Sequence, residues 1–337
     1  MTILITGGCG FIGTNFVENW LSSMNEKLIN VDKLSYAAVH ETANIINANY
    51  SFVKLDIRQT QEIKSLFQEY QPRAVIHFAA ESHVDRSIDN PSNFIETNVA
   101  GTFSLLEASK DYFSQLDDRQ KSLFKYINIS TDEVYGSLQK NDPPFTEQSS
   151  INPSSPYSAS KASSDLIARS YYKTYGLPVI ISRCSNNFGE YQHREKFIPT
   201  IINSIASGKE IPIYGDGNQV RDWIYVADHV EALMTLLKQA KPGSIYNLGG
   251  DKELENINLA RLICELMAKR EMKNPSYYDD LIVSVTDRLG HDFRYAVNYQ
   301  KINGDWGWRP KHKFNDALLR TIEWYLVEKT KANEMDQ

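Results

Sequence analysis

The chain has 337 residues, of which 42% are hydrophobic, and its formal net charge is −6. This length predicts one large or two closely joined domains, and an acidic balance without any basic block argues against nucleic acid or an anionic membrane as a partner. The cysteines Cys9, Cys184 and Cys264 show no CxxC spacing, so we expect neither disulfides nor a bound metal. We expect a cytoplasmic protein, because we find no signal peptide and no apolar run long enough to span a bilayer.

Strand-like runs alternate with amphipathic helical stretches through the first half of the chain. The predicted strands lie at 2–6, 27–32, 51–56, 74–80, 124–130 and 178–184. The predicted helices lie near 12–24, 60–70, 92–113 and 157–175. This order predicts an α/β protein with a Rossmann-like, doubly wound parallel sheet and helices on both faces. Such sheets bind ligands beyond the carboxyl ends of their strands.

The pattern loosens after about residue 185, where Gly- and Pro-rich connections separate the helical stretches. Helices are predicted at 197–208, 257–270 and 314–329. A later strand at 244–250 is expected to rejoin the first sheet. We therefore predict a first domain over 1–184, rejoined by that strand, and a smaller, partly interleaved C-terminal α/β domain mainly over 185–330.

The segment "ITGGCGFIG" (5–13) places Gly7, Gly10 and Gly13 between the first strand and the first helix. Glycines there allow a tight turn and let backbone N–H groups approach a pyrophosphate, although a glycine-rich turn can also serve packing alone. Asp32 ends the second strand, where a carboxylate would accept hydrogen bonds from ribose hydroxyls and repel a 2′-phosphate. This predicts a dinucleotide site that prefers NAD over NADP. The positive charge of the neighbouring Lys33 slightly weakens that preference.

The segment "SPYSASKASSD" (155–165) holds Tyr157 and Lys161 four residues apart, and therefore on one helix face. Pro156 suits the first turn of that helix. A lysine ammonium and a helix N-terminus both favour a phenolate, so we expect the pKa of Tyr157 to fall from its usual value of about 10. A phenol with such a pKa can accept the proton of a sugar hydroxyl while hydride leaves the same carbon.

Residues 130–136, "STDEVYG", follow an apolar stretch and place Thr131, Asp132 and Glu133 at a predicted strand end. Taken alone, the pattern favours a local interpretation, in which Thr131 or Asp132 caps a short helical turn. A second interpretation is chemical, because elimination of water needs an acid and a base on different atoms of the substrate.

The glycine loop together with Tyr-x3-Lys resembles the extended short-chain dehydrogenase/reductase superfamily. Seven stretches in order resemble its dTDP-glucose 4,6-dehydratase family over nearly the whole chain: "DKLSYA", "AAESHVDRSI", "STDEVYG", "SPYSASKASSD", "SNNFG", "PIYGDGNQVRDWIYV" and "DRLGHDFRY". The carboxyl pair discriminates within the superfamily. Related epimerases usually carry small or hydroxylic residues there, and related decarboxylases and GDP-mannose dehydratases tend to keep only the glutamate.

The resemblance implies an NAD-dependent lyase that converts dTDP-glucose to dTDP-4-keto-6-deoxyglucose plus water. Tyr157, supported by Lys161, would deprotonate the glucose 4-hydroxyl during C4 oxidation, and Thr131 would hydrogen-bond the 4-oxygen. Glu133 would remove the C5 proton and Asp132 would protonate the departing 6-hydroxyl before hydride returns to C6. Asp132 must then be protonated while Glu133 is ionised, as expected when two close carboxyls split their titrations.

The resemblance also implies two sets of binding residues. The cofactor set is Gly7, Gly10, Phe11, Ile12, Gly13, Asp32, Lys33, Leu34, Ser35, Asp56, Ile57, Ala79, Ala80, Ser82, Thr97, Tyr157, Lys161 and Asn187. The sugar-nucleotide set is Ser82, His83, Thr131, Asn186, Lys196, Phe197, Pro212, Tyr214, Arg221, Asn256, Arg288 and His291. Within the second set, Arg221 and Arg288 supply guanidinium groups for a diphosphate.

Four positions depart from the family pattern around the nucleotide pocket: Glu190, Arg194 and Phe197 replace the usual Pro, Pro and Leu, and Leu289 replaces a Pro. They leave the base preference open, so a UDP-glucose 4,6-dehydratase is the next hypothesis and a 4-epimerase the third. A non-catalytic NAD-binding sensor or scaffold is the alternative from another class. The resemblance further implies a homodimer, in which the helices near 92–113 and 157–175 of each subunit form a bundle.

Overall fold

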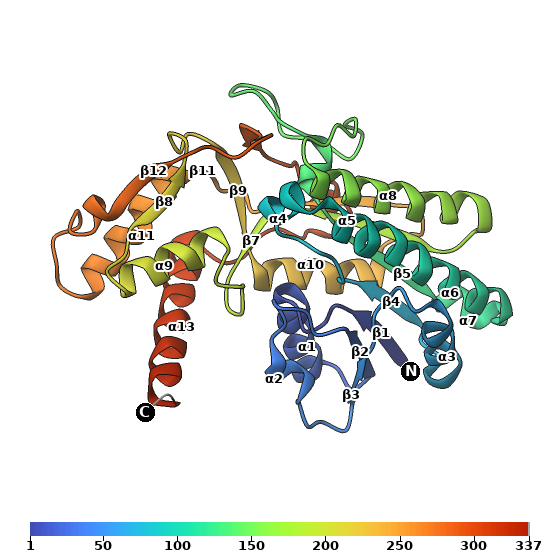
Figure 1. The fold of residues 1–337 in the computed structure, drawn as a ribbon. Coiled ribbons are helices and arrows are strands. Elements are labelled where there is room, and N and C mark those ends of the chain that lie inside the picture. The colour runs from blue at the N-terminus through green and yellow to red at the C-terminus, as the bar shows by residue number, and fades with distance from the viewer. Residues whose placement is uncertain (336–337) are drawn as a thin grey trace.

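The computed structural model describes residues 1–335, and a seven-stranded parallel sheet lies at its centre (Figure 1). The strand order is β10–β6–β5–β4–β1–β2–β3. The bounds are β1 (Thr2–Thr6), β2 (Lys27–Asp32), β3 (Tyr50–Lys54), β4 (Ala74–His77), β5 (Lys125–Thr131), β6 (Val179–Cys184) and β10 (Ile245–Leu248). The predicted α/β fold with a doubly wound parallel sheet is confirmed, and β10 is the late strand that joins the first sheet beside β6.

Helices cover both faces of this sheet, which explains why its strands are continuous apolar runs. On one face, α1 (Phe11–Ser23) and α10 (Val226–Gln239) pack over strand residues such as Ile3 and Ile5. On the other face, α3 (Thr60–Tyr70), α6 (Thr102–Gln115) and α8 (Pro156–Tyr175) pack over Leu4 and its neighbours. Adjacent residues of β1 therefore support opposite layers.

The long helix predicted near 92–113 is interrupted. It consists of α5 (Pro91–Phe94), a π-helical segment (Ile95–Gly101) and α6. The wider π-helical turn carries Asn98, whose side chain accepts from the Glu81 N–H at 2.8 Å and donates to Ser160 Oγ at 2.9 Å. These bonds connect the interrupted helix to the loop after β4 and to α8. Such π-helical turns occur frequently at functional sites.

A buried ion pair fixes α8 against the sheet. The Arg183 guanidinium of β6 lies 2.8 Å from the Asp165 carboxylate of α8, and both side chains are almost fully buried. Asn128 of β5 donates to the same carboxylate at 3.0 Å, and the Tyr135 hydroxyl lies 2.9 Å from the guanidinium. Both charges are therefore paired and hydrogen-bonded, which offsets the cost of removing these two groups from water.

The C-terminal part of the chain builds a second core around shorter elements. Its strands are β7 (Asn186–Phe188), β8 (Ile211–Tyr214), β9 (Val220–Tyr225), β11 (Glu253–Glu255), β12 (Ile282–Val285) and β13 (Arg294–Tyr295). Its main helices are α9 (Phe197–Ala206), α11 (Asn256–Arg270) and α13 (Phe314–Met335). Figure 1 shows these elements to one side of the central sheet, whereas α10 returns beside α1. The division into domains at residues 184 and 185 stays a prediction.

Several elements were not predicted from the sequence. The helices α4 (Val84–Asp89), α7 (Asp118–Leu123), α10 and α12 (Gln300–Trp306) were missed, as were the strands from β7 to β9 and from β11 to β13. The strands have two to six residues, so their periodicity is weak, and α10 begins directly after β9 without a loop between them. No helix within the described part of the chain is long and apolar enough to cross a membrane.

Candidate active site

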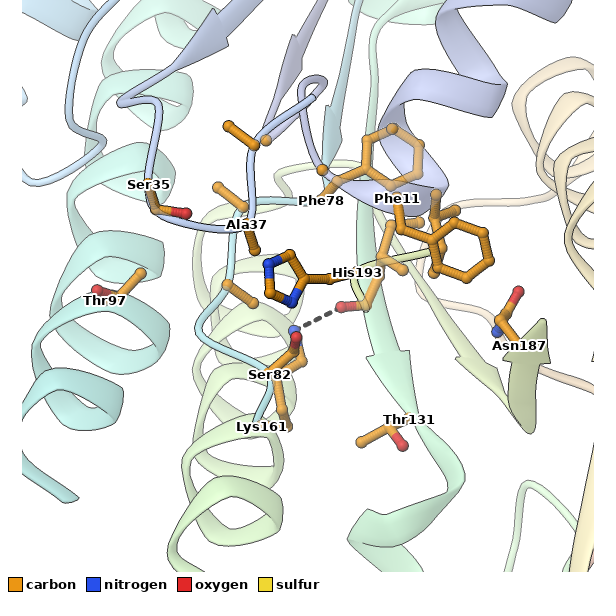
Figure 2. A pocket seen from close by; sticks show the side chains of 18 of the residues that line it. Phe11, Ser35, Ala37, Phe78, Ser82, Thr97, Thr131, Lys161, Asn187 and His193 are labelled. Atoms are coloured by element: carbon orange, nitrogen blue, oxygen red, sulfur yellow. Dashed lines mark hydrogen bonds between the residues drawn. The ribbon is translucent and has the colours of Figure 1, made fainter. Parts of the chain in front are cut away.

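A cavity of about 300 Å³ lies at the carboxyl ends of the central strands (Figure 2). Its lining includes Gly7 after β1, Asp32 at the end of β2, Ala79 after β4, Thr131 at the end of β5 and Cys184 at the end of β6. This is the position at which an open parallel sheet binds ligands.

In the glycine loop after β1, neighbouring backbone atoms lie too close to leave room for a side chain at Gly7 or Gly13. Gly7 has a φ of +73°, and a Cβ there would lie 2.4 Å from the Ala79 nitrogen. A Cβ on Gly13 would lie 2.4 Å from the Gly7 carbonyl oxygen. Gly10 precedes α1, and all three glycines line the cavity. A bare backbone at a helix N-terminus fits the pyrophosphate of a dinucleotide.

Asp32 is held in the cavity wall by backbone donors. Its carboxylate accepts from the Cys9 N–H at 3.0 Å and from the Leu34 N–H at 2.8 Å. Burial raises the pKa of this carboxyl, and the two N–H groups oppose the rise. Lys33 donates to the Glu81 carboxylate at 2.8 Å. Its positive charge, which opposed the predicted preference for NAD, is therefore already paired with an acid.

The predicted cofactor residues converge on this cavity. All of them line it except Leu34, which has a φ of +58° and contributes its backbone N–H to Asp32. The cavity also contains residues that the sequence analysis did not single out: Val31, Ala37, Ala38, Leu55, Phe78, Ile129, Ser130, Cys184, Ser185, Gln192, His193 and Glu195. Seven of these lie at or beside the ends of predicted strands, a position from which the sequence could have predicted them: Val31, Leu55, Phe78, Ile129, Ser130, Cys184 and Ser185. His193 and Glu195 carried no comparable signal.

Tyr157 and Lys161 lie in the first turns of α8, whose start is fixed by a capping box. Ser155 Oγ accepts from the Ser158 N–H at 3.1 Å, and Ser158 Oγ accepts from the Ser155 N–H at 2.9 Å. Lys161 Nζ donates to the Ile129 carbonyl of β5 at 2.6 Å. Both Tyr157 and Lys161 line the cavity, as predicted from their spacing on one helix face.

The expected fall in the pKa of Tyr157 is wrong for the protein alone. Burial raises the pKa of this phenol well above its usual value, and the charges of Glu133, Cys184 and Asp132 act in the same direction. The Thr131 hydroxyl opposes the rise. The pKa of Lys161 is lowered, because its ammonium is also buried. Desolvation therefore outweighs the effect that was inferred from the helix spacing.

Thr131 organises the carboxyl pair. Its Oγ1 accepts from the Glu133 N–H at 3.3 Å and donates to Asp132 Oδ1 at 3.2 Å. It thereby caps a 3₁₀ turn over Asp132–Tyr135, so the local interpretation of the motif is also correct. All three residues line the cavity that contains Tyr157 and Lys161.

The two carboxyls differ in their surroundings. Asp132 is 1% exposed, and its Oδ2 has no hydrogen-bond partner among the residues that the structure describes. Burial raises the pKa of Asp132 well above its usual value, and the charge of Glu133 adds to the rise. The pKa of Glu133 is also raised by burial, but Arg221, Lys196 and Arg288 oppose that rise. These directions agree with the expectation that Asp132 keeps the proton while Glu133 ionises.

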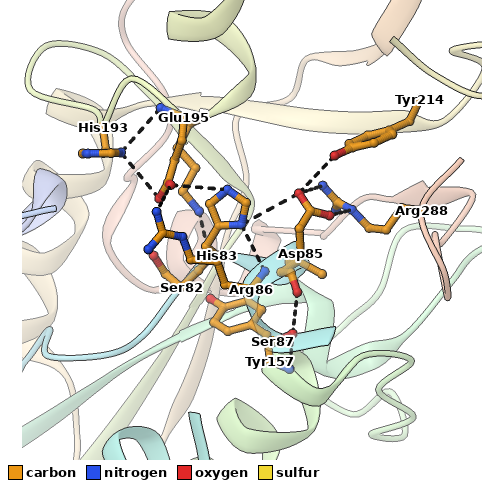
Figure 3. A network of polar contacts seen from close by, with 12 residues as sticks. Ser82, His83, Asp85, Arg86, Ser87, Tyr157, His193, Glu195, Tyr214 and Arg288 are labelled. Carbon is orange, nitrogen blue, oxygen red and sulfur yellow. Dashed lines mark hydrogen bonds and ion pairs between the residues drawn. The ribbon is translucent and has the colours of Figure 1, made fainter. Parts of the chain in front are cut away.

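The predicted sugar-nucleotide residues fall into two groups. Ser82, Thr131, Asn186 and Lys196 line the cavity. The others lie outside that lining: His83, Phe197, Pro212, Tyr214, Arg221, Asn256, Arg288 and His291. Among them, Tyr214 and Arg288 meet Asp85 of α4, and His83 lies beside Glu195 (Figure 3).

Arg221 and Phe197 already make internal contacts. The Arg221 guanidinium donates to the Val220 and Asp292 carbonyls at 2.8 and 3.0 Å and lies 4.3 Å from the centre of the Tyr295 ring. The Phe197 ring stacks on Trp223 with centroids 6.3 Å apart. These contacts position both side chains, and for Phe197 they are those of a core residue.

Comparison with known proteins places the chain among nucleotide-sugar enzymes. A family model described as GDP-mannose 4,6 dehydratase matches residues 4–321. The dTDP-glucose 4,6-dehydratase of Haemophilus influenzae is 46% identical over 98% of this chain and 100% of that protein. The dTDP-glucose 4,6-dehydratase 1 of Escherichia coli K12 is 47% identical over 97% of this chain and 93% of that protein. The chain belongs to the dTDP-glucose 4,6-dehydratase family.

Solved structures support this assignment and show its limit. The dTDP-glucose 4,6-dehydratase DesIV from Streptomyces venezuelae, solved with NAD and TYD bound, superimposes with a TM-score of 0.88 at 39% identity, covering 98% of each chain. The UDP-glucose 4-epimerase of Thermotoga maritima superimposes almost as well, with a TM-score of 0.86 at 28% identity over 98% of this chain and all of that chain. The fold alone therefore does not distinguish a dehydratase from an epimerase. The distinction depends on the carboxyl pair, Asp132 and Glu133.

The raised pKa of Asp132 predicts how this dehydratase loses stability with pH. A carboxyl whose pKa is higher in the folded state binds more protons when folded, so its contribution to stability falls as pH rises above the unfolded pKa. We expect Asp132→Asn to increase the free energy of unfolding at pH 7–8 and to flatten its decline from pH 5 upwards, measured by chemical denaturation across pH. The exposed Asp280→Asn is the control and should follow wild type. A less stable Asp132→Asn protein at pH 8 would contradict the prediction.

Proposed function

We propose that the protein converts dTDP-glucose into dTDP-4-keto-6-deoxyglucose and water, with NAD as a resident cofactor. The single observation that carries this proposal is the convergence of Asp132, Glu133 and Tyr157 on the cavity that also contains the glycine loop. The relatives named dTDP-glucose 4,6-dehydratase, at 46–47% identity over nearly their whole length, support the choice of substrate.

The cofactor fits the chain's own residues. The side-chain-free turn at Gly7, Gly10 and Gly13 would hold the pyrophosphate, and Asp32 would accept from ribose hydroxyls, as argued above for NAD. Bound there, NAD supplies a hydride acceptor and donor, and it is regenerated in each cycle. DesIV and the dTDP-glucose 4,6-dehydratase of Bacillus anthracis were both solved with NAD bound.

Tyr157 is the proposed base for the glucose 4-hydroxyl. Because burial raises the pKa of this phenol, the phenol is protonated in the protein alone. NAD bound in its oxidised form would add positive charge near the phenol and favour its deprotonation. Lys161 is held by the Ile129 carbonyl at 2.6 Å and supplies a nearby ammonium, while Thr131 would donate to the 4-oxygen.

Asp132 and Glu133 are the proposed acid and base of the elimination. Glu133 has three cationic neighbours that favour its ionised form, so it would remove the C5 proton once C4 is oxidised. Asp132 is buried beside that negative charge and keeps its own proton, which it would give to the departing 6-hydroxyl. Epimerisation at C4 has no use for this pair, since no bond at C5 or C6 breaks.

The preference for one nucleotide base over another depends on residues around the sugar-nucleotide site. Of the departures from the family pattern, Glu190 accepts from the Tyr225 hydroxyl at 2.9 Å, Phe197 stacks on Trp223, and Leu289 is largely exposed. None of these contacts selects thymine over uracil, so a UDP-glucose 4,6-dehydratase remains the second candidate. A non-catalytic NAD-binding protein would not need the acid and base that this cavity contains.

Product analysis tests the reaction and the base preference together. With dTDP-glucose and UDP-glucose in parallel incubations, we expect mass spectrometry to show loss of one water and a 4-keto-6-deoxy product, with dTDP-glucose preferred. An unchanged mass with galactose formed would support an epimerase instead. Tight binding of NAD and both nucleotides without turnover would support the sensor.

Asp132→Asn tests the division of labour between the carboxyls. Loss of a general acid costs typically 10²–10⁴-fold, so we expect elimination to slow by about that factor while C4 oxidation changes far less. Rapid-mixing measurements that follow cofactor reduction and water loss separately would resolve the two steps. Equal slowing of both steps would remove Asp132 from the role of acid.

A homodimer is the proposed assembly, and the cytoplasm the proposed location. Large apolar side chains are exposed on the two helices predicted to pair, with Phe103 of α6 50% exposed and Leu166 of α8 53% exposed. These faces suit a helix bundle between two copies. All three cysteines are free and buried, as suits a reducing compartment.

Light scattering tests the proposed assembly. At micromolar concentration, we expect a mass twice that of the 38.5 kDa chain. We expect Leu166→Glu to shift it towards one chain, because a charge would then lie in the apolar contact. A wild-type protein with the mass of one chain would reject the dimer.

A further inference from the structure

Asp85 is an acid near the candidate active site that the proposed chemistry does not use. It lies in α4, whereas Arg288 lies 203 positions later, in the loop after β12. Arg288 Nε is 2.6 Å from Asp85 Oδ1, and Arg288 Nη2 donates to Asp85 Oδ2 at 3.3 Å. The Tyr214 hydroxyl donates to the same Oδ2 at 3.2 Å, so two predicted sugar-nucleotide residues share one carboxylate (Figure 3).

The contact between Asp85 and Arg288 is close but poorly directed. Although Nε lies near Oδ1, it makes no hydrogen bond within the described residues, and the bond from Nη2 is long. The two side chains are 31% and 23% exposed, so water still reaches the pair. A well-aligned pair would form two parallel, short hydrogen bonds. This pair is therefore weaker than the best that a guanidinium can make.

A phosphate group competes for the same donors. Carboxylate and phosphate oxygens both match the planar set of donors on a guanidinium, and a diphosphate carries more charge than one carboxylate. The neighbouring Arg86 is already paired with Glu195 at 2.9 Å and is not the cation that Asp85 holds.

We propose that Asp85 is a displaceable counter-ion of the sugar-nucleotide site, which holds Arg288 and Tyr214 until the diphosphate of a nucleoside diphosphate takes its place. The inference rests on the proposed function, since it assigns Arg288 to the diphosphate. Asp85 acts as a specificity-determining residue, because a ligand must carry enough negative charge at this point to outcompete it. A ligand without phosphate gains nothing from the exchange.

Binding of dTDP to the NAD-loaded protein by titration calorimetry tests this role. We expect Asp85→Asn to bind dTDP about 3- to 10-fold more tightly than wild type, which corresponds to about 0.7–1.4 kcal/mol. Thymidine, which lacks phosphate, should show no such gain. Asp89→Asn is the matched control, since it removes the same charge from the exposed end of the same helix. It should leave the dissociation constant of dTDP unchanged.

A double-variant comparison separates displacement from a general change in charge. In the Arg288→Gln background, which should weaken dTDP binding at least 10-fold, Asp85→Asn should add nothing. Asp85→Ser provides a second removal of the carboxylate if Asp85→Asn folds poorly, as judged by circular dichroism. Unchanged or weaker dTDP binding by a folded Asp85 variant overturns the proposal, and so does a gain that persists without Arg288.

The outcome is distinguishable from failure of the proposed function. That function fails if the wild-type protein turns over neither dTDP-glucose nor UDP-glucose. The role of Asp85 depends only on the binding of dTDP and, in a parallel series, UDP. If wild type binds neither nucleotide, Arg288 is not a diphosphate ligand and the counter-ion role falls with it.

Discussion

Burial of two adjacent carboxyls in one cavity is the constraint on which the rest of the structure depends. Asp132 and Glu133 follow β5 directly, and desolvation raises the pKa of both carboxyls, so that each ionises at a cost. Three cations stand around Glu133, whereas the surroundings of Asp132 leave one of its oxygens without a hydrogen bond in the described part of the chain. The asymmetry converts two chemically similar groups into one acid and one base.

The scaffold holds this arrangement through short polar contacts with backbone groups. Thr131 caps the turn that carries both carboxyls, and the Ser155–Ser158 capping box fixes the start of α8. Lys161 reaches back to the Ile129 carbonyl on the neighbouring strand. Because these partners lie on β5 and α8, the phenol and the carboxyls share one rigid frame. Such preorganisation is what makes electrostatic stabilisation effective in a catalytic site.

Charge pairing also connects the two parts of the chain around the cleft. Asp85 of α4 reaches Arg288 of the C-terminal part, and Arg86 of the same helix reaches Glu195 in the loop before α9. Tyr36, beyond β2, donates to Glu195 at 2.7 Å. Ion pairs and a hydrogen bond between distant segments of the chain therefore hold together the loops on the cofactor side and those on the nucleotide side. A charged ligand that enters the cleft meets these groups already paired.

Local pattern was enough to predict much of this protein. The glycine spacing, Asp32 at a strand end and the four-residue separation of Tyr157 and Lys161 are short-range features, and the parallel sheet then brings strand ends together. The order of motifs was enough to indicate the dehydratase family. The placement of these residues around one cavity is confirmed, because backbone geometry dictates it over a few residues. Their binding and catalytic roles stay predictions.

Only the tertiary structure decided the rest. The rise in the pKa of Tyr157 depends on how completely its phenol is removed from water, which no spacing reveals. The π-helical turn at 95–101 is held by Asn98 through bonds to Glu81 and Ser160, on other segments of the chain. The contact of Asp85 with Arg288 joins residues that are remote in sequence and adjacent only after folding. Burial and long-range pairing arise from tertiary packing. The sequence determines them, but they cannot be predicted from its local patterns.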